Sequence, residues 1–452
     1  MHRNARLVPV GLMASVLAAA LASCYRAAPI DEAAVLREIR AESRRVAGGG
    51  PADPAAPVLL TEEAAVAAAV ANAPRVVAAR GEVAVARAGV REARRLDNPE
   101  LRASNEHPIE GAGRADQLQL AVRWDPPNPW VFTAATAVAE AEVTIAEARL
   151  ATEIARAARE ARSAHNRAAH AAARSAVADE QIRLATRRVD LLGEGARHGA
   201  TDPLDLAAAG IGLAETRAAA ARAGARGADA LVELAALTGI AAIAVTPLEP
   251  AACSAPPPGD PSAEDAAATS HPLVREARAA YARSEAVLRE QHARQVPWLR
   301  WVQIGWEHRF ERGASPGDPA ADPARDGLVL GAALELPFLD WNLGGVARGK
   351  AERDRDGNRL RASLAQVVAS ARAARDRWRG ARASFERLVA DAAPAAQRAV
   401  ETAGKAAAAG RIPEAAALDA MARALRIRVA LLDAALECRE AEIEARRTAG
   451  EP

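Results

Sequence analysis

Aromatic side chains are scarce in this chain of 452 residues, because Phe, Trp and Tyr together make up only 3% of it. Globular cores depend on such large side chains, so the composition argues against one compact core. Alanine supplies most of the hydrophobic residues instead. Together with Arg, Glu and Leu, alanine is typical of long, closely packed helices.

A net charge of either sign is also absent, because 59 Lys and Arg residues nearly balance 58 Asp and Glu residues. This balance gives no indication of a nucleic-acid partner. The sequence has no P-loop, no G-x-S-x-G, no H-E-x-x-H and no histidine spacing typical of a metal site. We therefore expect no enzyme activity, no cofactor and no bound metal.

The first 23 residues predict a lipoprotein signal peptide. Arg3 and Arg6 precede an apolar run over residues 7–21, which is too short for a permanent membrane anchor. The run ends in Leu21-Ala22-Ser23-Cys24, which resembles the lipobox of bacterial lipoproteins. The resemblance implies acylation of Cys24, an acylated segment over residues 24–60 and, since Tyr25 follows, the outer membrane. The alternative is an ordinary signal peptide with an incidental cysteine.

Two further cysteines, Cys253 and Cys438, lie far apart in the sequence. An export route permits a disulfide between them. The sequence alone favours two unpaired thiols.

The rest of the chain is an internal duplication, with one half over residues 61–250 and the other over residues 251–448. Asn72-Ala73-Pro74 recurs 198 residues later as Ser270-His271-Pro272. Further on, the spacing is 211 residues and three positions match: Pro126 with Pro337, Trp130 with Trp341, and Gly199 with Gly410. The spacing grows by 211 − 198 = 13 residues across the Gly- and Pro-rich stretch 311–326, which predicts an exposed loop.

Each half predicts the same order of elements. Short helices begin near Thr61 and Ser262, and the next helices open at Pro74 and Pro272. The first half continues with strands 100–106 and 117–124, a long helix 133–198 and a return helix 203–238. The second continues with strands 298–310 and 327–336, a long helix 345–410 and a return helix 413–448. Each long helix would extend roughly 100 Å at ~1.5 Å per residue, which favours a cylinder wall.

The predicted strands alternate apolar and polar residues, as Leu118, Leu120 and Val122 do against Gln119 and Arg123. Tryptophans concentrate in or beside these strands, which is typical of the aromatic girdles of a membrane barrel. The alternative is a soluble sheet with core tryptophans. The predicted girdle consists of Trp124, Trp130, Trp298, Trp306 and Trp341.

Four transmembrane strands cannot close a barrel, and open strand edges are not tolerated in lipid. The chain must therefore assemble, and strand number alone permits eight strands from a dimer or twelve from a trimer. The stretch Leu336-Pro337-Phe338-Leu339-Asp340-Trp341-Asn342 resembles the strand-to-helix junction of the outer-membrane efflux protein family, the TolC-like ducts. Residues 198–206 and 409–413 resemble the family's glycine-centred helix tips. The resemblance extends from about Leu60 to Arg447.

The resemblance implies a mainly α fold with a small transmembrane β part. Three chains would form a twelve-stranded barrel continuous with a long periplasmic α-helical barrel. It also implies that the two tips dock a periplasmic adaptor. Those tips are formed by Gly199, Ala200, Thr201, Asp202, Pro203 and Leu204, and by Gly410, Arg411, Ile412 and Pro413.

One gate residue follows from the same resemblance. The family can close its periplasmic entrance with rings of aspartates after the second tip, and Asp419 matches one of these positions while Ala416 stands at the other. The resemblance thus implies a single ring of three Asp419 carboxylates. The alternative is a solvated helix aspartate.

The predicted function is a passive exit duct in the outer membrane, coupled through an adaptor to an inner-membrane pump. The alternative is a structural periplasmic lipoprotein without a pore. The sequence does not identify the cargo, since drugs, metal cations and polypeptides all use such ducts.

Overall fold

The computed structural model describes residues 30–37, 57–106, 117–240, 243–250, 268–310, 324–336 and 340–448. The chain divides into two units, Met1–Ala56 and Pro57–Pro452. The described part of the first unit contains a short helix over residues 32–37, and the Asp31 carboxylate caps it by accepting the Ala33 N–H at 3.0 Å. The predicted signal peptide and Cys24 lie outside the described residues.

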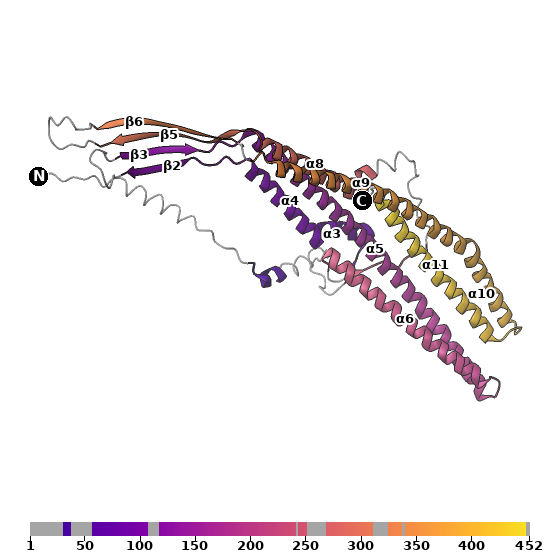
Figure 1. Cartoon of the computed structure of the whole chain (residues 1–452). Helices are drawn as coiled ribbons and strands as arrows, with labels where there is room; N and C mark the ends of the chain where they lie inside the picture. Colours follow the sequence, from indigo (N-terminus) through magenta and orange to yellow (C-terminus); the bar gives the residue numbers. More distant parts are fainter. Residues whose placement is uncertain are drawn as a thin grey trace, which may run out of the picture. The chain divides into compact units, whose positions relative to one another are not determined.

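Over its described residues, the first half of the second unit contains four helices and a strand pair (Figure 1). Its short elements are β1 (Val58–Leu59), α3 (Glu62–Asn72), α4 (Pro74–Ala93) and β4 (Ile243–Ala244). Its strand pair consists of β2 (Glu100–Glu106) and β3 (Gln117–Trp124), over the residues predicted from the sequence. The long helix α5 (Pro129–Arg197) and the return helix α6 (Pro203–Thr238) follow.

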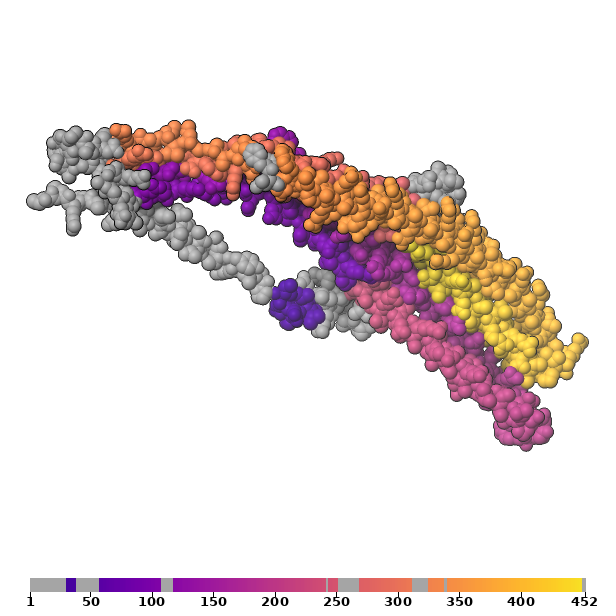
Figure 2. Space-filling model, in the orientation of Figure 1, coloured from indigo at the N-terminus to yellow at the C-terminus, as the bar shows by residue number. Residues whose placement is uncertain are grey.

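The second half repeats this order. It contains α8 (Pro272–Ala293), β5 (Trp298–Arg309), β6 (Arg325–Glu335), α9 (Leu343–Arg387), the π-helical turn η1 (Leu388–Ala392), α10 (Ala393–Ala408) and α11 (Glu414–Thr448). The two strands begin and end within two residues of their predicted bounds. The start predicted near Ser262 lies outside the described residues. In Figure 2 the second half, orange to yellow, forms a band beside the first half, indigo to pink.

The first long helix begins four residues earlier than predicted. The Asn128 side-chain oxygen accepts the N–H groups of Trp130 and Val131, at 3.0 and 3.3 Å, which makes Asn128 the N-cap. Pro129 then occupies the first helical position, where its missing N–H has no cost. The cap and the proline therefore start the helix at residue 129 rather than at the predicted Thr133.

The second long helix is not one uninterrupted α-helix, as predicted over residues 345–410, because η1 separates α9 from α10. The interruption lies directly before Pro394, which has no N–H to donate and whose ring crowds the carbonyl four residues back. In η1 the Ala393 N–H bonds the Leu388 carbonyl, five residues back. A π turn of this kind relieves the crowding without ending the helix.

The duplication is visible in the ends of the return helices. Thr238 closes α6 and Thr448 closes α11, and each hydroxyl donates to the carbonyl four residues back, at 2.8 and 3.2 Å. Both threonines are buried. Since Pro203 and Pro413 precede the two helices in the same way, positions in α6 match positions 210 residues later in α11.

The core is built on α5, which packs against α3, α4, α6, α8 and α11. Most of its buried residues are alanines, among them Ala157, Ala161 and Ala164. Larger apolar side chains gather in one cluster, where Phe385, Leu425 and Leu432 are buried together. The small alanine side chains let neighbouring backbones approach closely, which compensates for the scarcity of aromatics.

Helices α5 and α11 also meet along a row of polar contacts, which we call the α5–α11 seam. Ser163 donates to Glu440 at 2.6 Å, and Arg174 pairs with Asp433 at 2.5 Å. Further along the same helices, Arg187 pairs with Glu414 and Arg188 with Asp419, both at 2.5 Å. Because α5 belongs to the first half and α11 to the second, the seam holds the two halves of the duplication together.

The helix α8 has an unusual N-cap, the buried side chain of His271. His271 is only 4% exposed, and its Nδ1 accepts the Leu273 N–H at 3.3 Å, which requires a ring without a proton on that nitrogen. Burial and the nearby Arg447 guanidinium lower the pKa of His271 below its usual 6.5. A lowered histidine pKa contributes stability at neutral pH, and this contribution is lost as the pH falls from about 6.5 through the folded-state pKa.

We therefore expect His271→Ala to reduce the stability of the protein by about 1 kcal/mol at pH 7.5, the usual contribution of an N-cap, and by less at pH 5. His271→Asn keeps a capping oxygen and should remove much of the pH dependence. Thermal unfolding from pH 5 to 8 measures both. Equal losses for His271→Ala at both pH values would contradict the assignment of a neutral cap.

Candidate functional site

The four long strands form one antiparallel sheet in the order β2-β3-β5-β6. The register places Leu120 opposite Trp306 and Val122 opposite Ile304. Leu328 and Leu330 continue these two rows on β6. Side chains alternate between the faces of a strand, so all these residues share one face. The apolar residues of this face are Leu101, Ala103, Leu118, Leu120, Val122, Trp124, Val302, Ile304, Trp306, Leu328, Leu330, Ala332 and Leu334. At the end of the sheet away from the helices, Asn105, His308 and Asp326 lie on the same face.

This apolar face is exposed rather than buried. Leu328 is 70% exposed and Leu330 is 69% exposed, although a soluble sheet would cover such side chains with a helix or a second sheet. Contiguous exposed apolar surfaces of this kind mark contact with a membrane or a partner. The sheet therefore needs a non-aqueous neighbour on this face.

The opposite face is polar. Ser104 donates to Gln119 at 3.4 Å across β2 and β3, and Glu307 pairs with Arg309 at 2.8 Å along β5. Gln303 lies opposite Arg123 on the same face. A sheet with one apolar and one hydrated face has the polarity required of a wall between lipid and water.

Four of the predicted girdle tryptophans lie near the helical end of the sheet. Trp130 and Trp298 meet edge to face, with centroids 5.6 Å apart. Trp124 donates to the Asp97 carbonyl at 3.1 Å, and Trp341, just before α9, is half-exposed. Trp306 lies farther along β5, beside His308. The tryptophans thus occupy two levels of the sheet, about 13 Å apart along the strand, because Trp306 lies four residues beyond Val302, which is opposite Trp124.

Trp301, another strand tryptophan, lies on the polar face and not with the girdle. A Cβ at Gly331 would come within 2.8 Å of the Trp301 indole, so this glycine leaves the space that the ring fills. The Arg123 guanidinium carbon lies 5.3 Å from the ring centroid, a cation–π contact. Ordinary alternation with Val302 and Ile304 places Trp301 on this face, and the register irregularity lies before it, between Leu299 and Trp301.

The two helix tips have the same backbone geometry. Gly199 and Gly410 have φ angles of 70° and 67°, which favour glycine. The next N–H reaches back to the Gly195 carbonyl at the first tip and to the Ala406 carbonyl at the second, both at 2.8 Å. This is the Schellman ending of a helix, and it turns both hairpins sharply.

The residues beyond these glycines face water. Asp202 caps α6 by accepting the Leu204 N–H at 2.8 Å, and the Leu204 side chain itself is 73% exposed. Ala200, Pro203, Arg411 and Pro413 are also exposed, while Thr201 and Ile412 are partly covered. Each tip therefore presents an ordered, exposed loop that contributes little to the packed core.

The predicted gate residue Asp419 does not stand alone. Its carboxylate pairs with Arg188 of α5 at 2.5 Å, as part of the α5–α11 seam. It also lines a groove of about 570 Å³ between α10 and α11, whose walls are mostly alanine. Asp205, the aspartate at the first tip, is exposed in the first turn of α6. Sequence reasoning missed Arg188, because nothing in the pattern shows which α5 residue faces α11.

Cys438 corrects the expectation of two unpaired thiols, because it is completely buried and disulfide-bonded. Its partner, one of the other two cysteines of the chain, lies outside the described residues. Within the described ranges, no three His, Cys, Asp or Glu side chains are grouped so that they could hold a metal ion. Over the same ranges, no helix is both long and apolar enough to cross a membrane.

Comparison with known proteins gives matches in structure alone. No family model and no curated sequence matches the chain. CusC, whose crystal structures concern conformational changes during folding and transmembrane channel formation, is 15% identical to this chain. It aligns with a TM-score of 0.69 over 88% of this chain and 93% of its own. The outer-membrane protein VceC of Vibrio cholerae is 16% identical, with a TM-score of 0.68 over 86% and 96%. The outer-membrane channel OprN is 20% identical, with a TM-score of 0.67 over 86% and 90%.

These alignments extend over both halves of the duplication and over nearly the full length of each matched protein. The prediction of a mainly α fold with a small β part is confirmed. At these identities the likeness concerns the fold, and the chain has the fold of the TolC-like outer-membrane channels.

Proposed function

We propose that this chain is a subunit of an outer-membrane exit duct, a passive conduit in an efflux or export system. The observation that carries this proposal is the sheet, whose exposed apolar face and hydrated face suit a wall between lipid and water. The shared fold with outer-membrane channels supports it. No enzyme activity is needed for this role, since a pump supplies the energy.

The open edges of the sheet support assembly into a closed barrel. β2 and β6 are the edge strands, and they run in opposite directions because three antiparallel pairings separate them. The β2 edge of one chain can therefore pair with the β6 edge of the next in the same antiparallel pattern. Three copies give the twelve-stranded barrel of the predicted homotrimer, with the girdle tryptophans near its interfaces with water.

The two exposed tips suit a role as docking points for a periplasmic adaptor, which would connect the duct to an inner-membrane pump. Residues 198–204 and 409–413 lie at the ends of the α5–α6 and α10–α11 hairpins, opposite to the sheet in the second unit (Figure 1). Acylation of Cys24 would add a lipid anchor on the side of the outer membrane. The long helices then extend into the periplasm.

A pair of substitutions on adjacent residues of β6 tests the channel. Leu330→Arg places a charge on the apolar face, which costs about 2–4 kcal/mol at the middle of a bilayer, and should abolish insertion. Val329→Arg is the matched control on the polar face. It should insert and shift the pore towards anion selectivity. Heat-stable trimers on gels and single-channel recordings in planar bilayers measure both effects.

Wild-type chains that stay monomeric and give no conductance would contradict the duct and favour the structural lipoprotein without a pore. Equal insertion of the two variants would contradict a lipid-facing apolar surface.

The proposed Asp419 gate can be tested through its ion pair. Asp419→Asn removes three carboxylates from the trimer and should raise closed-state conductance and reduce cation selectivity. Arg188→Gln leaves the carboxylates unpaired and should increase cation selectivity, the opposite direction. Asp205→Asn at the first tip is the matched control with the same charge change. If Asp419→Asn conducts with unchanged selectivity, Asp419 is a structural residue of the seam.

Which cysteine is paired with Cys438 depends on the proposed lipid anchor. An acylated Cys24 thiol cannot also form a disulfide, so acylation leaves Cys253 as the partner. Peptide mapping of the mature protein without reduction should find a Cys253–Cys438 peptide, and labelling with palmitate should depend on Cys24. A Cys24–Cys438 peptide would contradict acylation at Cys24, since the two modifications use the same sulfur.

A further inference from the structure

A second concave surface lies where α5, α8 and α11 meet, away from the sheet and the tips. It encloses about 640 Å³, within the range of small-molecule sites. Ile154, Leu273 and Ile443 give it apolar walls. Five arginines also line it, and we call this site the arginine pocket: Arg156, Arg159, Arg162, Arg275 and Arg447.

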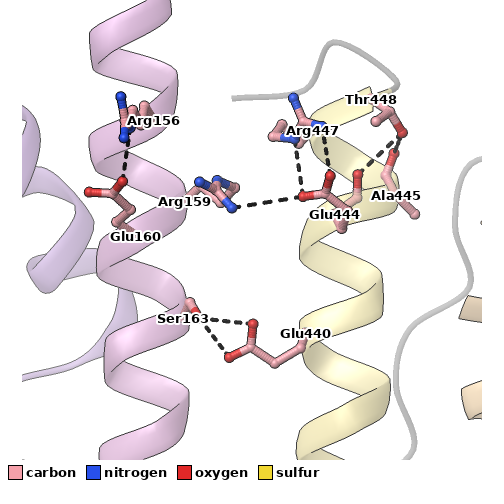
Figure 3. Close-up of polar contacts among 9 residues, drawn as sticks. All are labelled: Arg156, Arg159, Glu160, Ser163, Glu440, Glu444, Ala445, Arg447 and Thr448. Atoms are coloured by element: carbon pink, nitrogen blue, oxygen red, sulfur yellow. Dashed lines mark hydrogen bonds and ion pairs between the residues drawn. The ribbon is translucent and has the colours of Figure 1, made fainter. Parts of the chain in front are cut away.

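The acidic residues around the arginine pocket are too few to neutralise it. Figure 3 shows Glu444 between Arg447 and Arg159, with nitrogen-to-oxygen distances of 2.6 and 4.0 Å. Arg156 pairs with Glu160 at 3.0 Å, but the Glu160 carboxylate also forms an ion pair with Arg75 at 2.5 Å. Each of these carboxylates is therefore shared by two guanidinium groups.

The remaining two arginines differ in their partners. Arg162 lies 3.7 Å from Glu62. Arg275 is exposed, and within the described parts of the chain no carboxylate lies at ion-pair distance from it. Glu440, one turn before Glu444, directs both oxygens to the Ser163 hydroxyl, at 2.6 and 2.8 Å (Figure 3).

The end of α8 that opens into the pocket strengthens its positive potential. Ser270, His271 and Pro272 line the pocket at the start of this 22-residue helix, where the helix dipole is positive. The lowered pKa of His271 is partly caused by Arg447, which is consistent with a positive local field.

The duplication indicates that the scaffold does not require these residues. In the first half, the position matching Arg275 is Val77 and the position matching His271 is Ala73, by the spacing of 198 residues. In the return helix, Arg447 matches Leu237 by the spacing of 210 residues that aligns Thr238 with Thr448. Three apolar positions of one half are thus basic or polar in the other, and all three gather around one pocket.

We propose that the arginine pocket binds an anion with two or more carboxylate or phosphate groups. Guanidinium groups match these ligands geometrically, since their N–H donors form paired hydrogen bonds with two oxygens. The half-enclosed site with apolar walls makes such bonds stronger than they are in open water. Arginines from three helices then converge on one ligand.

The test uses the full-length trimer in detergent and citrate, a tricarboxylate, as the probe. Isothermal titration at constant ionic strength should show one saturable site per chain. The double substitution Arg156→Gln with Arg275→Val should weaken citrate binding at least tenfold. Arg348→Gln on α9 is the matched control, because its side chain is 82% exposed and lies outside the pocket, and it should change affinity less than twofold.

Two further probes test whether the bound anion is a free phosphate or a carboxylate-bearing component of the cell envelope. Inorganic phosphate represents a free phosphate, and a soluble cell-wall peptide with free carboxylates represents the envelope. Saturable binding of either one that depends on Arg156 and Arg275 supports the site and identifies its source. Absence of saturable binding for all three probes, or equal binding by the double variant, overturns it.

The thermal stability and the conductance of the double variant are measured to show whether it folds correctly. Both should match those of the wild type, because Val77 shows that the fold accepts valine at the position matching Arg275. Binding in detergent does not depend on conductance, so a failed channel test and a failed binding test remain distinguishable.

Discussion

Close approach of alanine-rich helices is the constraint on which the rest of the structure depends. α5 buries alanines such as Ala161 and Ala164 against several neighbours, and few large side chains are available to replace that packing. Small interfaces bury little apolar area each, so the contacts must be repeated over a long helix to stabilise the fold. The length of α5 is therefore a consequence of its composition, and the distance between sheet and tips follows from that length.

The sequence predicted the features that depend on local or repeated signals. Proline and glycine mark the ends of the helices, so the return helix at Pro203 and the tips at Gly199 and Gly410 lie where expected. Period-two alternation marked the strands, because one face of the sheet is apolar and the other polar. The duplication made each weak signal count twice.

Features that depend on contacts between distant residues were not predictable in this way. The π turn before Pro394 changes the second long helix, although proline alone does not indicate whether a helix bends, stops or widens. The pair Arg188–Asp419 and the disulfide of Cys438 each depend on which helix faces which, and sequence spacing carries no such information. The faces of Trp298 and Leu299 depend on the register irregularity between Leu299 and Trp301, because a shift of one residue reverses the face.

The open edges and exposed apolar face of the sheet have a consequence for how the protein is made. A single chain released into water would carry two unpaired strand edges beside an apolar surface, the combination that most readily leads to aggregation. Its helices have no such problem, since their backbone hydrogen bonds are internal and their surfaces are rich in ion pairs. Biogenesis must therefore protect one small region, the sheet, until its two edges and its apolar face are covered.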